Sequence, residues 1–378
     1  MRFLVARLLG LVLVGVVYAA GCTPAATVSP TSTAPPATAA KPVASPAGAA
    51  PTPSAPSVAP APTAAPASAP SPSVGAAAKP APAAPSPSAS PAASASGAQQ
   101  QTSFPLTLSD DRGKSLTLAA PVQRIVTLQP STTEIACAVG ACARIVATDD
   151  FSDFPDEVKR RPKLGGLDMS AEAIIGQRPD LILTDSGTRA DLVQQVEQAG
   201  LIVLVTDAKT FDDVYRDIGL IARALGAAEA GTQVVDDMRA RAQAVTSKTS
   251  SVSRRPRVFH ELDASDPNRP FAVGPGTFID QIITLAGGSN ALAASPVAYP
   301  QVSTEQVVAA DPEIITLGDE DFGTSPDDVV ARPGWAGITA VKKRAIVAVD
   351  TNQVSRPGPR LVAALEQFAH IIHPELFP

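Results

Sequence analysis

Few side chains in this 378-residue sequence have the types and spacing needed for covalent or metal chemistry. Its only histidines are His260, His370 and His373, and the last two are three positions apart near the C-terminus with no clear partner for a zinc or manganese site. No nucleophile is paired with a base in a pattern that covalent catalysis would use. We therefore expect no catalytic residue, no metal site and no cofactor. His260 lies in the strand-like run RVFHELD, where we expect a buried histidine, with contact to a ligand or a haem iron as the alternative.

Two cysteines lie close together in the chain. Cys137 and Cys142 are five positions apart across Gly140, at the predicted end of a helix. In an oxidising compartment this spacing allows a local disulfide. We favour the simpler interpretation, in which both are small buried apolar residues.

Two carboxylates occur at matching places of a repeat. SAEAIIGQRPDLIL (170–183) and STEQVVAADPEIIT (303–316) are 133 positions apart. In each copy a serine can cap a short helix, a glutamate (Glu172 or Glu305) falls in its first turn, and a proline ends the helix before a buried strand. A carboxylate in a first turn interacts favourably with the helix dipole by about 0.3–1 kcal/mol, so a structural role alone would explain each glutamate. The repeat predicts one similar unit in each of two lobes.

A polar loop, QPST, follows the apolar run RIVTL (124–128) and leads into a helix. Ser131 and Glu134 have the spacing of a capping box, and that role alone is the simpler interpretation. The alternative is that the backbone amides of this helix start face a polar group of a ligand, because open α/β sheets bind ligands at the carboxyl ends of their strands. Pro130, Ser131 and Thr132 are therefore candidate ligand-binding residues.

The elements that position these residues follow an α/β pattern. From residue 124 to 207, short β-branched apolar runs alternate with helical stretches, which predicts a parallel sheet covered on both faces. A hairpin precedes it at 105–118, with Gly113 in the turn. From residue 211 to 247 the apolar spacing is helical without a strand, and the α/β pattern restarts at residue 257. The predicted boundaries are 101–225 for the first lobe, 226–255 for an interlobe helix and 256–378 for the second lobe.

The first hundred residues cannot build a hydrophobic core. Residues 1–22 have the charged start and short apolar run of an export signal, and the residues before Cys22 resemble the lipobox of bacterial lipoproteins. We expect lipidation of Cys22, with an ordinary secretory signal as the alternative. Residues 23–100 are almost entirely Ala, Pro, Ser and Thr, so we expect a disordered tether that reaches ~240 Å when fully extended at ~3.1 Å per residue.

The remaining part of the chain is acidic. Four of the chain's 30 basic residues (Arg2, Arg7, Lys41 and Lys79) precede residue 101, and none of its 36 acidic residues does. The remaining 26 basic and 36 acidic residues give a formal net charge of −10. This balance disfavours nucleic acid as a partner.

From residue 104 to the end, the order and spacing of several segments resemble the extracytoplasmic solute-binding proteins of the iron-chelate, haem and cobalamin ABC transporter class. The segments are QRIVTLQPSTTEI, KLGGLDMSAEAIIGQRPDLIL, FAVGPGTFIDQIITLAGGSNALA, YPQVSTEQVVAADPEII, ARPGWAGITAVKKRAIVAVD and SRPGPRLVAALEQ. The resemblance implies two Rossmann-like lobes with mostly parallel sheets, joined by a long rigid helix, with a ligand cleft between them. It also implies a monomer, anchored to the outer face of the cytoplasmic membrane, that captures a nutrient and delivers it to ABC permease subunits.

By the same resemblance, Glu172 and Glu305 match the paired surface glutamates, one per lobe, that dock onto arginines of the permease. Four further positions match ligand-facing ones: Phe151 and Phe154 in FSDFPDE, Tyr299 in VAYPQV and Arg356 in SRPGPR. We expect Arg360, which opens the last helix, to be structural. Trp335, the only tryptophan, is expected to be a structural anchor, with a cleft role as the alternative.

The expected ligand class rests on the aromatic side chains. Tyr299 and the two loop phenylalanines offer flat apolar faces to a corrin ring, so we expect cobalamin or a related corrinoid. A ferric siderophore, for which Arg356 is the clear candidate contact, and haem, which needs an axial ligand such as Tyr299 or His260, are the alternatives. A stand-alone surface lipoprotein that scavenges ligand without a permease is a different class of function.

Overall fold

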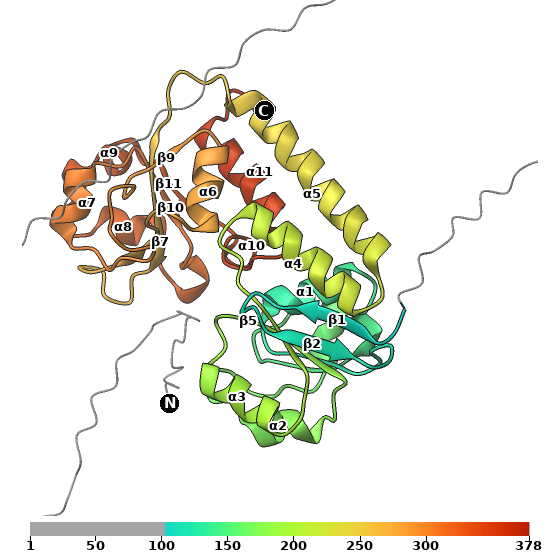
Figure 1. The fold of residues 1–378 in the computed structure, drawn as a ribbon. Coiled ribbons are helices and arrows are strands. Elements are labelled where there is room, and N and C mark those ends of the chain that lie inside the picture. Colours follow the sequence, from blue (N-terminus) through green and yellow to red (C-terminus); the bar gives the residue numbers. More distant parts are fainter. Residues whose placement is uncertain (1–102, 378) are drawn as a thin grey trace, which may run out of the picture. The chain divides into compact units, whose positions relative to one another are not determined.

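The computed structural model describes residues 103–377 (Figure 1). The predicted export signal, the lipidation site Cys22 and the tether to residue 100 lie outside the described residues. Within residues 103–377, no helix combines the length and the apolar character needed to cross a bilayer. These residues form two α/β lobes, each with its own sheet, as predicted.

The N-terminal lobe is built on an all-parallel sheet with the strand order β4-β3-β5-β6. Successive residues of one strand face opposite layers, so Ile125 packs with one pair of helices and Val126 with the other. The elements are the hairpin β1 (Leu106–Ser109) and β2 (Ser115–Leu118); strands β3 (Ile125–Thr127), β4 (Ile145–Thr148), β5 (Leu181–Asp185) and β6 (Val203–Thr206); helices α1 (Pro130–Ala138) and α4 (Phe211–Ala224) on one face; and α2 (Ala171–Gly176) and α3 (Ala190–Gln198) on the other. The predicted hairpin is confirmed, with Gly113 in its turn at φ 76°.

The C-terminal lobe repeats this plan. Its sheet has the order β11-β10-β7, and β9 (parallel) and β8 (antiparallel) pair with the free edge of β7. Val258 and Phe259 of β7 again face opposite layers. The elements are strands β7 (Arg257–Asp263), β8 (Phe271–Ala272), β9 (Ser289–Asn290), β10 (Ile314–Leu317) and β11 (Ile346–Ala348); helices α6 (Phe278–Leu285) and α11 (Leu361–Ile372) on one face; α7 (Thr304–Ala310), α8 (Pro326–Val330) and α9 (Thr339–Lys343) on the other; and the short α10 (Thr351–Val354).

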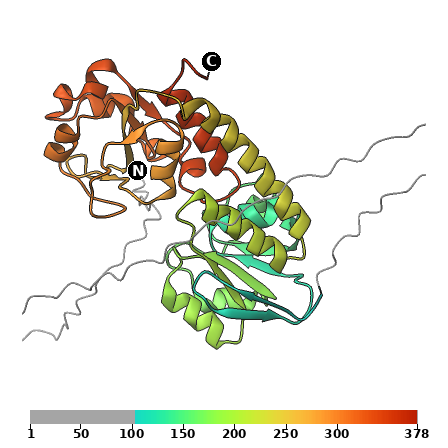
Figure 2. The ribbon, with the colours of Figure 1, turned by 45° about the horizontal axis from the view of Figure 1, so that its top comes forward.

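A 22-residue helix, α5 (Ala228–Thr249), connects the lobes. It packs against α4 of the N-terminal lobe and against α6 and α11 of the C-terminal lobe (Figures 1 and 2). A Cβ at Gly231 would lie 2.4 Å from the Cβ of Ala222, so only glycine allows this close approach of α5 to α4. One apolar core continues from the N-terminal lobe under α5 into α6 and α11, and this shared core resists bending between the lobes.

The repeated phrase forms the same structure in both lobes. In the N-terminal copy, the Arg124 guanidinium donates to the carbonyls of Gln177 and Arg178 at 2.7 and 3.1 Å and so satisfies the C-terminal end of α2. The Asp180 carboxylate accepts the backbone N–H groups of Gln123 and Arg124, both at 2.8 Å. Arg178 adopts a left-handed backbone at φ 48° just before the proline that ends the helix.

The C-terminal copy uses the equivalent residues, each 133 positions further along. Arg257 donates to the carbonyls of Ala310 and Asp311 at the end of α7, and the Glu313 carboxylate accepts the Arg257 N–H at 3.1 Å. Asp311 is left-handed at φ 40°. The predicted repeat is therefore confirmed, and it includes the arginine at the start of β7 that corresponds to Arg124 before β3.

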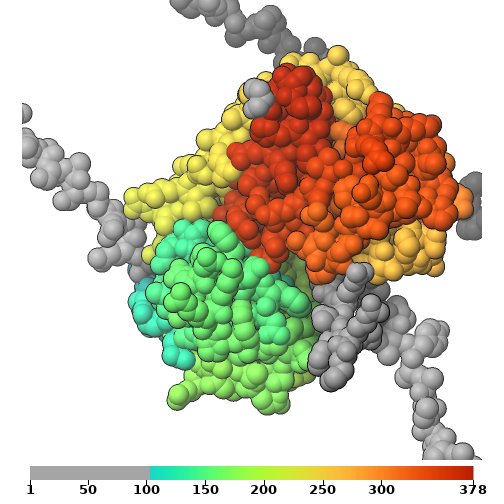
Figure 3. Space-filling model, turned by 180° about the vertical axis from the view of Figure 1, so that it is seen from behind, coloured from blue at the N-terminus to red at the C-terminus, as the bar shows by residue number. Residues whose placement is uncertain are grey.

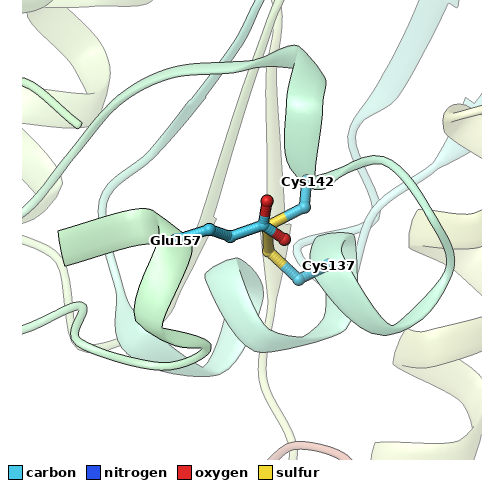
Figure 4. Close-up of side chains that lie close together, drawn as sticks. All are labelled: Cys137, Cys142 and Glu157. Atoms are coloured by element: carbon cyan, nitrogen blue, oxygen red, sulfur yellow. A yellow bond between two sulfur atoms is a disulfide. The ribbon is translucent and has the colours of Figure 1, made fainter. Parts of the chain in front are cut away.

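Cys137 and Cys142 form a disulfide, so our preferred interpretation of two small apolar residues is wrong. Gly140, at φ 84°, reverses the chain after α1 and brings the two Cα atoms to 4.1 Å. An oxygen of the Glu157 carboxylate lies within 4.8 Å of both sulfur atoms (Figure 4). Because both sulfurs are bonded to each other, this group is not a metal site.

Candidate ligand-binding site

The carboxyl ends of β3, β5 and β6 bring together polar side chains that are distant in sequence. The Ser131 hydroxyl, after β3, donates to the Asp185 carboxylate at the end of β5 at 2.7 Å. Burial raises the pKa of Asp185. Beside it, the Ser186 hydroxyl donates to Asp207, which follows β6, at 2.6 Å. The edge of the sheet at which α/β proteins bind ligands is thus occupied by carboxylates and hydroxyls.

The predicted capping box at the start of α1 is wrong. The helix begins at Pro130, a residue favoured in the first helical turn, and its N-cap Gln129 makes no side-chain cap. Ser131 is therefore inside the helix, where its hydroxyl bonds to Asp185, and Glu134 bonds to arginines of the other lobe. Ser131 and Thr132 are buried, while Pro130 is partly exposed. Ligand contact by these three residues stays a prediction.

Glu134 links the lobes. Its side chain is 2% exposed and accepts hydrogen bonds from Arg360 and from Arg356, the latter at 3.2 Å. Arg356 also donates to Asp153 at 2.6 Å and to the Phe151 carbonyl at 3.2 Å. A predicted ligand contact in the C-terminal lobe is thus bonded to three groups of the N-terminal lobe. Sequence reasoning missed the role of Glu134, because it assigned this carboxylate to the helix cap.

Phe151 and Phe154 are exposed, by 41% and 43%. The Arg360 guanidinium lies 4.2 Å from the centre of the Phe154 ring, in a cation–π contact. A Cβ at Gly166 would lie 3.1 Å from the Phe151 ring, so the absence of a side chain there gives this ring room. The structure therefore brings the two predicted phenylalanines together with Arg356 and Arg360.

A buried carboxylate holds this aromatic loop in place. Asp149, after β4, accepts the backbone N–H groups of Phe151 and Ser152 at 2.7 and 3.0 Å. Burial raises the pKa of Asp149, while hydrogen bonds from Ser152 and Phe151 oppose the shift. The Lys163 ammonium donates to the Asp149 carbonyl at 3.1 Å. The sequence signal for this positioning role is an acidic residue directly after a buried strand.

Tyr299 comes from the C-terminal lobe and is 41% exposed. Its segment is fixed by backbone bonds from Ala272 to Pro300 and from Gly274 to Ala298, at 2.9 and 2.8 Å. Partial burial and then the charge of Asp207 raise the pKa of Tyr299. Exposed aromatic side chains thus come from both lobes.

Glu172 and Glu305 are both exposed, in the first turns of α2 and α7. As predicted, a serine caps each helix: the Ser170 hydroxyl accepts from Ala173, and Ser303 forms a capping box. Both helices lie on the sheet faces opposite to the shared core, so the glutamates occupy equivalent outer positions of the two lobes. Their docking role stays a prediction.

His260 and Trp335 belong to the core of the C-terminal lobe. His260 is 1% exposed, burial lowers its pKa to about 3, and its Nδ1 shares a hydrogen bond with Thr316 at 2.9 Å. Trp335 is fully buried, with the Arg332 guanidinium 4.7 Å from its ring centre. The expected burial of both residues is confirmed, but the hydrogen bonding expected for a buried His260 is only half satisfied, because its Nε2 has no partner among the described residues.

A cavity of about 520 Å³ lies elsewhere, between the end of α5, α6 and β9. Its charged groups are already bonded within the chain: Arg255 donates to the Thr284 carbonyl at 3.0 Å, and Asp280 accepts from Asn290 at 2.8 Å. None of the predicted ligand residues lines it. The polar and aromatic groups at the strand ends are the better candidate site.

Two similar α/β lobes, connected by a long helix and each carrying exposed aromatic side chains in a loop, define a two-lobed solute-binding protein. The chain belongs to the periplasmic binding protein family, whose model matches residues 125–352. The predicted fold class and family are therefore confirmed.

Individual relatives agree with this assignment. The chain is 32% identical over 287 residues to an uncharacterized ABC transporter substrate-binding lipoprotein, YvrC, of Bacillus subtilis, covering 75% of this chain and 90% of that one. It is 30% identical over 286 residues to a cobalamin-binding protein of Halobacterium salinarum, covering 73% and 76%. Among solved structures, it resembles the periplasmic heme-binding protein RhuT from Roseiflexus sp. RS-1, with a TM-score of 0.62, 28% identity, and coverage of 67% and 99%.

Proposed function

We propose that this chain captures a bulky, flat metal chelate, cobalamin or a related corrinoid, outside the cytoplasmic membrane and delivers it to an ABC permease without catalysing a reaction. The observation that carries the proposal is the exposure of Phe151 and Phe154, in the loop after β4 of the N-terminal lobe, and of Tyr299, in the segment between β9 and α7 of the C-terminal lobe. Exposed aromatic rings are costly in water and gain most by packing against a large apolar face. The cobalamin-binding relative of Halobacterium salinarum supports the same ligand class.

The charges near these rings favour a corrinoid over a ferric siderophore. A siderophore with carboxylate groups would need a free guanidinium, whereas Arg356 is already bonded to Glu134 and Asp153. Binding such a ligand through Arg356 would break contacts that connect the lobes. A corrin ring can pack on the aromatic rings and leave the contacts of Arg356 between the lobes intact.

Haem is the second candidate ligand, and the similarity to RhuT, which is named as a periplasmic heme-binding protein, favours it. Haem iron needs an axial ligand. His260 is buried and bonded to Thr316, so it is poorly placed for this role. Of the two candidate axial ligands, this leaves Tyr299, whose side chain is exposed.

The predicted lipid anchor and tether suit this role. Lipidation at Cys22 would hold a monomer at the outer face of the membrane, and the tether of residues 23–100 would let it reach both ligand and permease. The lipoprotein named among the relatives supports the anchor. Glu172 and Glu305 would orient the protein on the permease, which distinguishes an importer component from a stand-alone scavenging lipoprotein.

Calorimetric titration of the mature protein with cyanocobalamin, haemin and a ferric hydroxamate siderophore tests the ligand class. Trp335 emission is a poor probe because this residue is fully buried. We expect saturable one-to-one binding of cyanocobalamin and much weaker binding of the other two ligands. Tight binding of haemin without cyanocobalamin binding would move the assignment to haem, and binding of none of the three would reject the proposal.

A further inference from the structure

The exposed apolar side chains are distributed unevenly over the molecule. Within residues 103–377, the large ones are Phe151, Phe154, Leu167, Ile175, Val297, Tyr299, Val308 and Val347. The phenylalanines and Tyr299 belong to the proposed ligand site, and Val297 precedes Tyr299 by two positions. Ile175 and Val308, exposed by 37% and 38%, lie outside it. They are 133 positions apart, so they are equivalent residues of the repeat.

Each of the two lies beside a predicted docking glutamate. Ile175 follows Glu172 by three positions on α2, and Val308 follows Glu305 by three positions on α7. Residues three positions apart are neighbours on a helix surface. Both helices therefore present a carboxylate and a β-branched apolar side chain next to each other.

Single exposed apolar residues are common on protein surfaces. Here the same combination occurs in both lobes, although neighbouring exposed positions of the repeat differ, with Gly176 in one copy and Ala309 in the other. A position that only faced water would gain solubility from a charged or polar residue. The recurrence of a β-branched apolar residue beside the same carboxylate indicates a surface that is covered by a partner.

We propose that Glu172 with Ile175, and Glu305 with Val308, form a two-part docking surface for the permease, which would offer each lobe a cationic side chain next to an apolar patch. This inference rests on the proposed function and adds the apolar half of the contact. The carboxylates supply orientation and a salt-sensitive attraction. The apolar side chains supply affinity that salt does not screen, because burial of apolar surface does not depend on charge.

The salt dependence of permease affinity distinguishes the charged half of the docking surface from the apolar half. The mature full-length chain is titrated against nanodiscs that contain an ABC permease of the cobalamin and iron-chelate class from the same organism, at about 0.15 M and about 1 M NaCl. In the variant Ile175→Thr with Val308→Thr, which keeps β-branching, we expect affinity for the permease to fall about tenfold at both salt concentrations. In Glu172→Gln with Glu305→Gln, we expect a large loss at low salt that shrinks at high salt.

Val347→Thr is the matched control, since Val347 is 36% exposed on β11, away from both helices. It should bind the permease like the wild type, and all variants should keep the wild-type melting temperature and ligand affinity. The inference is overturned if the double threonine variant binds within twofold of the wild type, or if Val347→Thr weakens binding equally. If the glutamine variant also binds undiminished, or the wild type does not bind at all, the proposed docking function fails as well.

Discussion

Arg360 forms a bidentate contact with the carboxylate of Glu134: its Nε donates to Oε2 at 2.9 Å and its Nη2 to Oε1 at 2.6 Å. Glu134 lies on α1 of the N-terminal lobe, and Arg360 directly precedes α11 of the C-terminal lobe. Figure 3 shows the red C-terminal segment against the green N-terminal lobe. The Glu134 side chain is 2% exposed, so this is a largely desolvated, bidentate contact between lobes. It lies directly beside Phe154, one of the proposed ligand-binding residues.

Replacing Glu134 by Gln should lower the free energy of unfolding by about 3 kcal/mol, because two partly buried guanidinium groups lose their carboxylate. Urea denaturation measures the loss. The matched control is Glu366→Gln, which breaks the more exposed Arg241–Glu366 pair between α5 and α11 and should cost less than about 1 kcal/mol. Equal losses in the two variants would show that the Glu134 contact contributes no more stability than a surface ion pair.

Removal of the disulfide by Cys137→Ala with Cys142→Ala should cost about 2 kcal/mol. The cost is small because a cross-link that closes a short loop removes little entropy from the unfolded chain. Ligand affinity should not change, because neither sulfur belongs to the proposed site. Thermal unfolding with and without reductant provides the check: reductant should destabilise the wild type only. A reductant effect of the same size in the double alanine variant would contradict the assignment.

Asp217 makes stability depend on pH. It is 1% exposed on α4, and burial together with the nearby Asp111 carboxylate raises its pKa from 3.8 to about 8. The folded state therefore holds a proton that the unfolded state releases between about pH 4 and about pH 8. Its contribution to stability is fully present below about pH 4 and is lost as the pH rises through about 8.

In the variant Asp217→Asn, the loss of stability that Asp217 causes with rising pH should disappear. The difference in unfolding free energy between variant and wild type should therefore grow in favour of the variant from pH 5 to about pH 8, by up to about 1.4 kcal/mol per pH unit, and level off above about pH 8. Chemical denaturation across this range provides the measurement. Asp212, exposed on the same helix, gives the control Asp212→Asn, which should run parallel to the wild type. Parallel curves for Asp217→Asn would show that this carboxyl is ionised in the folded protein.

Tyr299 separates the two candidate ligands. Tyr299→Phe keeps the ring and removes the hydroxyl, so cobalamin affinity should stay within about threefold of the wild type, whereas Tyr299→Ala should lower it at least tenfold. If haem is the ligand and this phenol its axial ligand, the phenylalanine variant should instead lose the characteristic charge-transfer absorption of a tyrosinate complex. Calorimetry and absorption spectra of the same samples decide between these outcomes.

The two docking glutamates should be required for uptake and not for binding. Glu172→Ala with Glu305→Ala should abolish ligand uptake in whole cells and leave the calorimetric ligand affinity unchanged, because both carboxylates are exposed outside the proposed ligand site. Glu229→Ala, an exposed glutamate in the first turn of α5, is the control and should transport normally. A fall in ligand affinity in the double variant would reject the docking assignment.

The sequence by itself determined the α/β class, the hairpin at Gly113, the long helix and the repeat with its capped helices. These features depend on rules that act over a few residues: the period of apolar positions, turn residues and caps. They also placed Glu172 and Glu305 in first helical turns, where the structure has them.

Only the tertiary structure decided which polar partners meet. Glu134 bonds to an arginine 226 positions away instead of capping its own helix, and Arg356 bonds to the opposite lobe. The pairing of Cys137 with Cys142 depended on a left-handed turn at Gly140 that spacing alone left open. Local spacing shows which bonds a side chain can reach, whereas the choice among them follows from the desolvation and packing of segments that are remote in sequence.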